Sequence, residues 1–295
     1  MRLKRSNRKT PLLWFLYHPY EGLWNWNLLR LIRKFIPTEK ITKFITRTII
    51  CLDTLILIIR AIVRRLTKIG FLKALFFNVK VPNDISIIYF DLGTHMEAEE
   101  LALMVNKILP RMCNSYKAYG FEADPNIFKH VQAKFAGNKN INLIHAALCY
   151  TIPQNGKIKL YKDIDVSGGS IYKTHTSDFE EVLAIKITDW IKEKNFNIEN
   201  NIFLLRMNIE GAEYDVIKDL VDNGFIDKID GYYGMWDDVA KITIKRGAKF
   251  YTFLRTRNIF PFTFNGRDFP YSLRLKCIEY DIRTSVKAAL ERIKN

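Results

Sequence analysis

The sequence predicts an α/β protein: a doubly wound, mostly parallel sheet of seven strands that is preceded by a basic helical extension. The chain has 295 residues, 48% of them apolar and 26% charged, which is ordinary globular usage and excludes a disordered or fibrous protein. After residue 82, short apolar runs alternate with helical patterns, as they do in βαβ units. Before that point the chain is strongly basic. We therefore expect an extension over residues 1–80 and an α/β domain over residues 81–295.

The positive charge is concentrated in the extension. Residues 1–80 hold 17 basic and 3 acidic side chains, whereas residues 81–295 hold 29 and 28. Apolar residues recur at helical spacing over residues 41–66, which predicts one long amphipathic helix. Arg47, Asp53 and Arg60 interrupt its apolar stretch. An Asp or Arg at a bilayer centre costs about 2.5–3.5 kcal/mol, whereas each Ile or Leu gains about 0.3–0.6 kcal/mol, so we expect this helix to lie on a surface rather than to span a membrane.

Two partners remain open for the extension. Its Lys and Arg residues, together with the aromatic residues over 14–26, favour an anionic membrane surface. The same helices could instead fold over the main domain as a lid or form a dimer contact. A nucleic acid is disfavoured because bulky aliphatic and aromatic residues at helical spacing suit burial better than a phosphate track. The oligomeric state is not determined by these patterns.

The four cysteines indicate neither a metal site nor a disulfide framework. They are scattered, with no C-x-x-C pair and no histidine at ligand spacing: Cys51, Cys113, Cys149 and Cys277. Buried reduced thiols suit the cytosol. The apolar stretch after the basic start of the chain is short and lacks a cleavage-site pattern. We expect a cytoplasmic protein, peripheral on the cytoplasmic membrane face if the extension binds lipid.

Seven apolar runs after residue 81 have the length and composition of strands. They span residues 86–91, 117–122, 142–148, 202–208, 229–234, 250–254 and 273–280. Helical patterns fit between them at residues 97–109, 125–135, 188–194, 212–223 and 238–246. A doubly wound sheet binds ligands outside the carboxyl ends of its strands, where the strand order reverses. The residues that follow these strands are therefore the candidates for a site.

Three of the strands end in polar residues. The first delivers Asp91 and then Gly93 at a tight turn, although a buried strand ending in Asp-x-Gly is a common structural feature. The second ends at Glu122, whose carboxylate could hold the paired hydroxyls of a ribose or serve as a helix-end charge beside Pro125. A later strand runs into a turn with two carboxylates and an amide, in the stretch Met207-Asn208-Ile209-Glu210-Gly211-Ala212-Glu213.

These segments together resemble the FkbM-type methyltransferase family. In that family a lysine, an isoleucine and an aspartate usually precede Val-Glu-Gly-Ala-Glu, which corresponds here to the stretch that ends at Glu213. The strand end Ala146-Ala147-Leu148, the loop Ser167-Gly168-Gly169-Ser170 and the stretch Ile187-Thr188-Asp189-Trp190-Ile191 follow the family in order and approximate spacing. The resemblance covers residues 86 to about 235.

The resemblance implies a Rossmann-like class I methyltransferase fold and an S-adenosylmethionine-dependent enzyme. Its acceptor would be a hydroxyl of a sugar, glycolipid or secondary metabolite. On this basis the methionine part of the cofactor would meet Asp91 and Gly93, its ribose would meet Glu122, and its adenine side would meet residues around Asn142 and Ala146. Thr94, His95 and Ala123 would also bind the cofactor. Glu210 and Glu213 would lie at the reaction centre or support it. Asn208 is a further catalytic candidate, and the loop residue His175 is a candidate base or a solvated histidine. No metal ligand is implied.

Four positions depart from the family pattern. His95 and Glu97 replace an asparagine and a glycine after the first strand, and Asn208 replaces an aspartate while Arg206 replaces the lysine before it. Glu97 adds bulk and charge near the expected cofactor, and Asn208 loses a charge. The alternative hypothesis is therefore a noncatalytic scaffold with a methyltransferase fold. An RNA-modifying enzyme is disfavoured because residues 81–295 are nearly neutral.

Overall fold

The computed structural model describes residues 78–162, 169–172, 177–197, 200–234, 238–257, 259, 262–263 and 271–294. Over residues 262–263, 271–277 and 294 this description is confined to the backbone. The expected extension over residues 1–80 lies almost wholly outside these ranges, as does His175, so the amphipathic helix and the division into two domains stay predictions.

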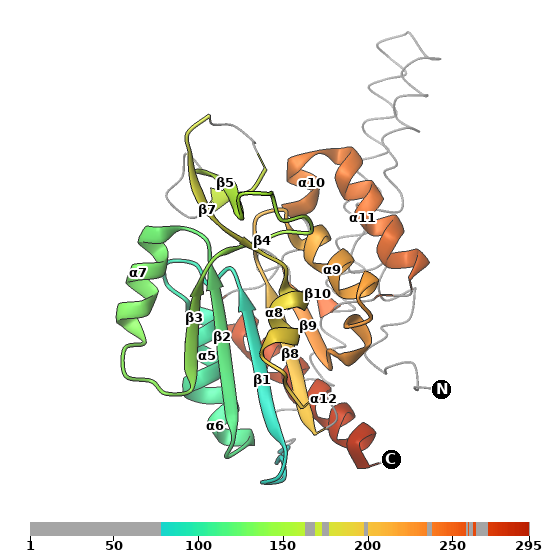
Figure 1. Ribbon diagram of the computed structural model, residues 1–295. Helices are drawn as coiled ribbons and strands as arrows, with labels where there is room; N and C mark the ends of the chain where they lie inside the picture. The colour runs from blue at the N-terminus through green and yellow to red at the C-terminus, as the bar shows by residue number, and fades with distance from the viewer. Residues whose placement is uncertain are drawn as a thin grey trace, which may run out of the picture. The chain divides into compact units, whose positions relative to one another are not determined.

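A six-stranded sheet forms the centre of the α/β domain (Figure 1). Its order is β10-β9-β8-β1-β2-β3, and all five pairings are parallel. The strands are β1 (Ser86–Leu92), β2 (Tyr116–Glu122), β3 (Ile141–His145), β8 (Asn201–Met207), β9 (Gly231–Gly234) and β10 (Phe262–Thr263). The chain moves outward from β1 to β3 and then crosses back to β8 on the other side of β1. The strand order therefore reverses between β1 and β8, as a doubly wound fold requires.

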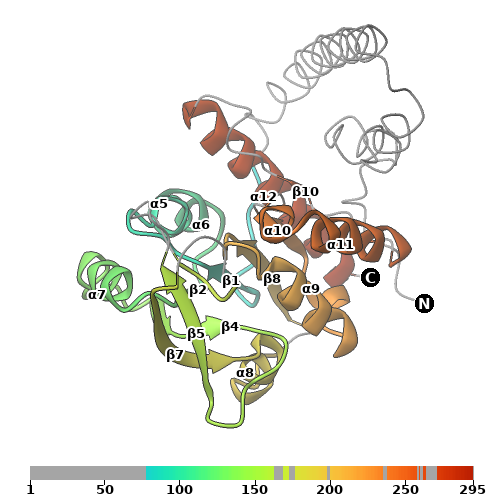
Figure 2. The same ribbon diagram turned by 90° about the horizontal axis from the view of Figure 1, so that it is seen from above.

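Helices cover both faces of this sheet. After β1 come α5 (Glu99–Leu103), the π-helix η1 (Met104–Ile108) and α6 (Leu109–Met112). The remaining helices are α7 (Pro125–Lys134), α8 (Ile187–Glu193), α9 (Glu213–Asp222), the 3₁₀ turn η2 (Ile226–Lys228), α10 (Asp238–Ile242), α11 (Ile244–Thr256) and α12 (Tyr271–Lys294). Figure 2 shows α5, α6 and α12 on one side of the sheet and α8 on the other.

Side chains alternate along the central strands and give the two faces different cores. On the α8 face, the fully buried Phe90 of β1 lies 6.2 Å from the ring of Phe203 on β8 and 6.2 Å from that of Trp190 on α8. On the opposite face, the hydroxyls of Tyr89 and Tyr233 lie 3.1 Å apart in a buried pair. One face is thus an aromatic core, and the other buries polar groups that need partners.

A second, smaller sheet follows β3. It consists of β4 (Ala147–Leu148), β7 (Phe179–Ile185), β5 (Lys157–Lys162) and β6 (Gly169–Ser170), in that order. Its own small core of Ala147, Leu160 and Val182 packs against Ala123, the residue directly after β2. The small sheet therefore lies at the carboxyl ends of the central strands (Figure 1).

The doubly wound parallel fold is confirmed, but the prediction of seven strands was wrong in two places. Residues 250–254 lie in α11 and residues 273–280 lie in α12. Both runs contain aromatic and β-branched residues that favour strands, yet their buried positions recur at helical spacing. In α11 these are Phe250 and Leu254, and in α12 they are Ile278, Ile282, Val286 and Ala289. Packing of one helical face thus overrides local strand propensity.

Candidate functional site

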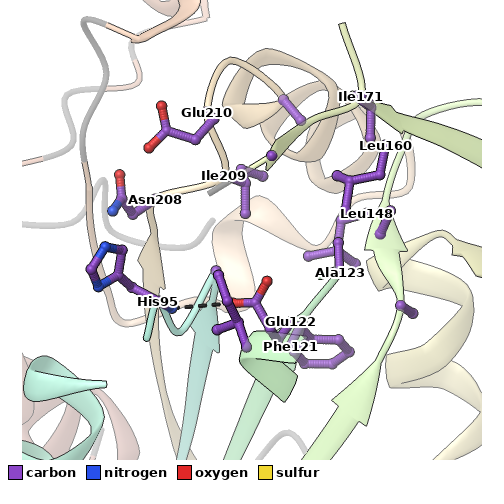
Figure 3. A pocket seen from close by; sticks show the side chains of 16 residues that line it. His95, Phe121, Glu122, Ala123, Leu148, Leu160, Ile171, Asn208, Ile209 and Glu210 are labelled. Carbon is purple, nitrogen blue, oxygen red and sulfur yellow. Dashed lines mark hydrogen bonds between the residues drawn. The ribbon is translucent and has the colours of Figure 1, made fainter. Parts of the chain in front are cut away.

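A cleft opens at the carboxyl ends of the central strands, at the point where the strand order reverses. It holds about 570 Å³ of space, part of which is open to solvent. The turns after β1, β2 and β8 form one part of it, and the small sheet forms most of the rest, together with Ile127 of α7 and Ala146 after β3 (Figure 3). Its lining residues are Gly93, His95, Phe121, Glu122, Ala123, Ile127, Ala146, Ala147, Leu148, Leu160, Gly169, Ile171, Asn208, Ile209, Glu210 and Ala212.

The turn after β1 interlocks with the turn after β8. Gly93 has φ 82°, and a Cβ there would lie 2.0 Å from the backbone oxygen of Asn208. The Asn208 N–H donates to the carbonyl of Leu92 at 2.8 Å, and the Gly93 N–H donates to the carbonyl of Phe121 at 2.8 Å. A side chain at residue 93 would force these turns apart, so a glycine is required there.

Glu122 faces the cleft with its carboxylate held by the protein. Its Oε2 accepts from the His95 N–H at 3.1 Å (Figure 3) and from the Thr94 hydroxyl at 3.2 Å, and its Oε1 accepts from the Asp124 N–H at 3.0 Å. Burial raises the pKa of Glu122, and these hydrogen bonds oppose the rise. The N-terminus of α7 is capped by Asp124, which accepts from the N–H groups of residues 126 and 127. Glu122 is therefore not the cap of that helix.

Asp91 lies beneath the cleft rather than in its wall. It is fully buried, and its Oδ1 accepts from Arg206 at 2.6 Å. Burial raises the pKa of Asp91 to about 6, with Arg206 opposing the rise. Asp91 is outside the lining of the cleft because a carboxylate on the second-last position of β1 points into the sheet face and pairs with β8. Its expected contact with the cofactor stays a prediction.

The two glutamates of the turn after β8 lie in different environments. Glu210 lines the cleft and has φ 49°, an uncommon value for a residue with a side chain. Glu213 is fully buried and accepts from the N–H groups of Ile209 and Gly211, both at 2.8 Å. Burial, followed by the nearby Asp238, raises the pKa of Glu213 to about 8. The Glu213 carboxylate therefore stabilises the turn that places Glu210 in the lining of the cleft.

The cleft has a polar flank and an apolar flank. Figure 3 shows the side chains of His95, Asn208 and Glu210 on one side. Leu148, Leu160 and Ile171, which come from or adjoin the small sheet, line the other side. Such a division suits a ligand that has an aromatic or aliphatic part and several hydroxyls or charged groups.

Seven of the twelve residues expected from the sequence line the cleft: Gly93, His95, Glu122, Ala123, Ala146, Asn208 and Glu210. Thr94, Asp91 and Glu213 are buried next to lining residues and support them. Asn142 lies outside the lining, because it is an exposed residue near the start of β3, three residues before that strand ends. His175 is outside the described residues. The apolar flank was missed, although the alternation in Lys157–Lys162 after Asn155-Gly156 is a strand signal.

Glu97, which replaces a glycine of the family pattern, does not obstruct the cleft. The Glu97 side chain is 63% exposed and lies 3.8 Å from the Lys134 ammonium on α7. Lys134 also donates to the Glu97 carbonyl. The extra carboxylate is thus directed to the surface, whereas Asn208 remains in the cleft wall.

Comparison with protein families shows to which family the chain belongs. The family model of the methyltransferase FkbM domain matches residues 92–253. The chain belongs to the FkbM methyltransferase family. This FkbM domain contains every residue that lines the cleft. Comparisons with curated proteins and with solved structures gave no significant match.

Two further findings concern the described part of this FkbM protein. No helix there is long and apolar enough to cross a membrane. Within the same ranges, no three His, Cys, Asp or Glu side chains come together in a way that could hold a metal ion.

Proposed function

We propose that this FkbM protein is an S-adenosylmethionine-dependent methyltransferase that methylates a hydroxyl of a sugar, glycolipid or secondary metabolite. The observation that carries the proposal is the placement of Glu122: a buried carboxylate at the tip of β2, facing a cleft at the reversal of strand order. That is where α/β folds hold the ribose of a nucleoside cofactor.

The cleft has groups that fit each part of this cofactor. Glu122 Oε1 accepts one backbone N–H in the structure, and a carboxylate oxygen has room for a second donor such as a ribose hydroxyl. Ala123 and Ala146, with the apolar flank, leave a surface suited to adenine. When bound, the cofactor supplies an electrophilic methyl group on a sulfonium.

The polar flank suits the acceptor. Asn208 can orient an acceptor hydroxyl by hydrogen bonding, and a carboxylate or an imidazole can remove its proton. Glu210 and His95 are the described residues of the lining that carry such groups on this flank. Holding the acceptor oxygen in line with the methyl group is the other contribution that we assign to this flank.

Calorimetric titration of the full chain with S-adenosylmethionine, and separately with S-adenosylhomocysteine, tests the proposal. We expect saturable binding of both. No heat and no thermal shift at millimolar ligand would contradict the enzyme hypothesis. That result would favour the alternative, a noncatalytic scaffold, which is supported by Asn208 in the cleft where the family pattern has an aspartate.

We further propose that residues 1–80 attach the protein to an anionic membrane surface on the cytoplasmic side. The support is the excess of 17 basic over 3 acidic residues together with the helical apolar stripe. A lid or a dimer contact is the alternative for the same residues.

A further inference from the structure

Arg206 lies on β8, two residues before the turn at Asn208, and its side chain contacts Asp91 on β1 and the turn at Gly93. We propose that Arg206 is a positioning residue, which fixes the turn at Gly93 against the turn at Asn208 in the arrangement that binds the cofactor. The inference rests on the proposed function and adds to it a residue outside the lining of the cleft. This chain has an arginine at residue 206, where the family pattern usually has a lysine.

The contacts of the Arg206 guanidinium come from three separate elements. Its Nη1 donates to Asp91 Oδ1 at 2.6 Å and also to the carbonyl of Gly93, and its Nη2 lies 3.4 Å from Glu100 Oε2 on α5. The Arg206 side chain is only 5% exposed. A buried charge is stable only when it is paired and hydrogen-bonded, so this guanidinium is confined to one position.

The same contacts fix Asp91 and the turn that follows it. Asp91 and Arg206 are direct neighbours in the parallel pairing of β1 with β8. Asp91 Oδ2 is buried and has no hydrogen-bond partner among the described residues, so Arg206 supplies the side-chain contact that orients this carboxylate. Two residues further on, the Gly93 carbonyl accepts from the same guanidinium. Arg206 thus joins the end of β1 to the end of β8 from below.

The position of Gly93 matters because the two turns interlock. The Asn208 N–H donates to Leu92 O, while the missing side chain of Gly93 leaves room for the Asn208 carbonyl. A displacement of the Gly93 turn would therefore move Asn208 and also His95, whose N–H donates to Glu122. Through this chain of contacts, Arg206 acts on residues of the cleft without touching a ligand.

An arginine is suited to this task because its planar fork can bind several acceptors at once. A lysine ammonium is a compact donor that cannot reach all three acceptors in the same way. Arg206→Lys removes the planar set of guanidinium donors and keeps the positive charge. The double variant Arg206→Gln with Asp91→Asn removes one positive and one negative charge together, so the net charge is unchanged.

The experiment measures the Kd of S-adenosylhomocysteine for the full chain by calorimetry. We expect Arg206→Lys to raise Kd by about 3- to 10-fold and the double variant to raise it by about 30-fold or more. Thr188→Val is the matched control, because Thr188 is fully buried and its hydroxyl donates to Asp219 between α8 and α9, outside the cleft. We expect this control to lower the melting temperature while Kd changes by less than about twofold.

Hydrogen exchange of the ligand-free full chain gives a second readout. We expect peptides over residues 90–96 and 205–212 to exchange about fivefold faster in the double variant, with no change over residues 157–162. This result does not depend on a ligand, so it remains informative if wild-type protein fails to bind and the proposed function falls.

Two results would overturn the inference. The first is an unchanged exchange rate in both turns, or unchanged Kd in Arg206→Lys and in the double variant. The second is a loss of affinity in Thr188→Val that equals the loss in the Arg206 variants at the same decrease in melting temperature, because the effect would then reflect stability alone. If the double variant does not fold, Arg206→Lys decides by the same criteria.

Discussion

Glu122 is the residue on which the cofactor proposal depends. If ribose hydroxyls donate to its carboxylate, Glu122→Ala loses charge-assisted hydrogen bonds of about 1.5–3 kcal/mol, which corresponds to a rise in the Kd of S-adenosylhomocysteine of roughly 10- to 150-fold. Glu122→Gln should fall between wild type and alanine. From the sequence alone little loss of stability is expected. The structure predicts a loss of stability as well, because the N–H groups of His95 and Asp124 lose their acceptor. This loss should lower the free energy of unfolding by about 1–3 kcal/mol.

Asp124→Ala is the control for this prediction. Asp124 caps α7 and is not part of the cleft lining, so its loss should lower the free energy of unfolding by about 0.5–2 kcal/mol and leave Kd unchanged. Urea unfolding and calorimetry on the same preparations separate the two effects. Equal affinities of Glu122→Ala and wild type would remove Glu122 from the site.

Glu213 gives a prediction about pH. Burial, with Asp238 nearby, raises the pKa of Glu213 in the folded protein to about 8, whereas in the unfolded chain it lies near the usual 4.3. Between these values the folded state binds a proton that the unfolded state has released, so this group makes stability fall as pH rises from about 4.3 to 8. We expect Glu213→Gln to show a shallower decrease in unfolding free energy over that range. Parallel curves for the two proteins would contradict the prediction.

At the scale of an element, the small sheet is predicted to form the apolar flank of the site. Leu160 on β5 is buried in the core of that sheet and lines the cleft. Leu160→Ala should lower the free energy of unfolding by about 2–5 kcal/mol through the cavity it leaves, and should weaken cofactor binding. Leu183→Ala on β7 is the matched control, since Leu183 is 53% exposed and should change stability by less than about 0.5 kcal/mol. If both variants bind the cofactor as wild type does, the apolar flank has no part in the site.

At the scale of the whole molecule, the charge of residues 1–80 predicts salt-dependent binding to anionic vesicles. Each basic residue near such a surface contributes about 1 kcal/mol, so Gln substitutions at Arg47, Arg60, Arg64 and Arg65 should reduce vesicle binding at least tenfold. Flotation of the full chain with anionic vesicles at low salt measures this. The matched control removes four exposed charges from the α/β domain, at Lys129, Lys139, Lys245 and Lys249, and should bind as wild type does. Equal flotation of both variants would favour the lid or dimer alternative.

The sequence determined the central strands up to β9 and the turns that follow three of them. Buried parallel strands are continuous apolar runs, and the residues at their carboxyl ends must meet at one edge of the sheet, so Gly93, Glu122 and Asn208 could be placed together from their order along the chain. The family pattern around Glu210 and Gly211 added the likeness to a methyltransferase. These features depend on local composition and on the order of the strands along the chain, and both can be obtained from the sequence.

The position of each polar residue relative to the cleft depends on contacts between segments that are far apart in the chain. Asp91 and Arg206 are 115 residues apart in the chain, and their pairing beneath the cleft follows from the register of β1 with β8, which no local pattern reveals. Packing likewise made helices of residues 250–254 and 273–280, because a buried stripe outweighs strand propensity of about 1 kcal/mol. Burial and hydrogen bonding arise from contacts between distant segments, and these contacts separated the carboxylates that line the cleft from those that support it.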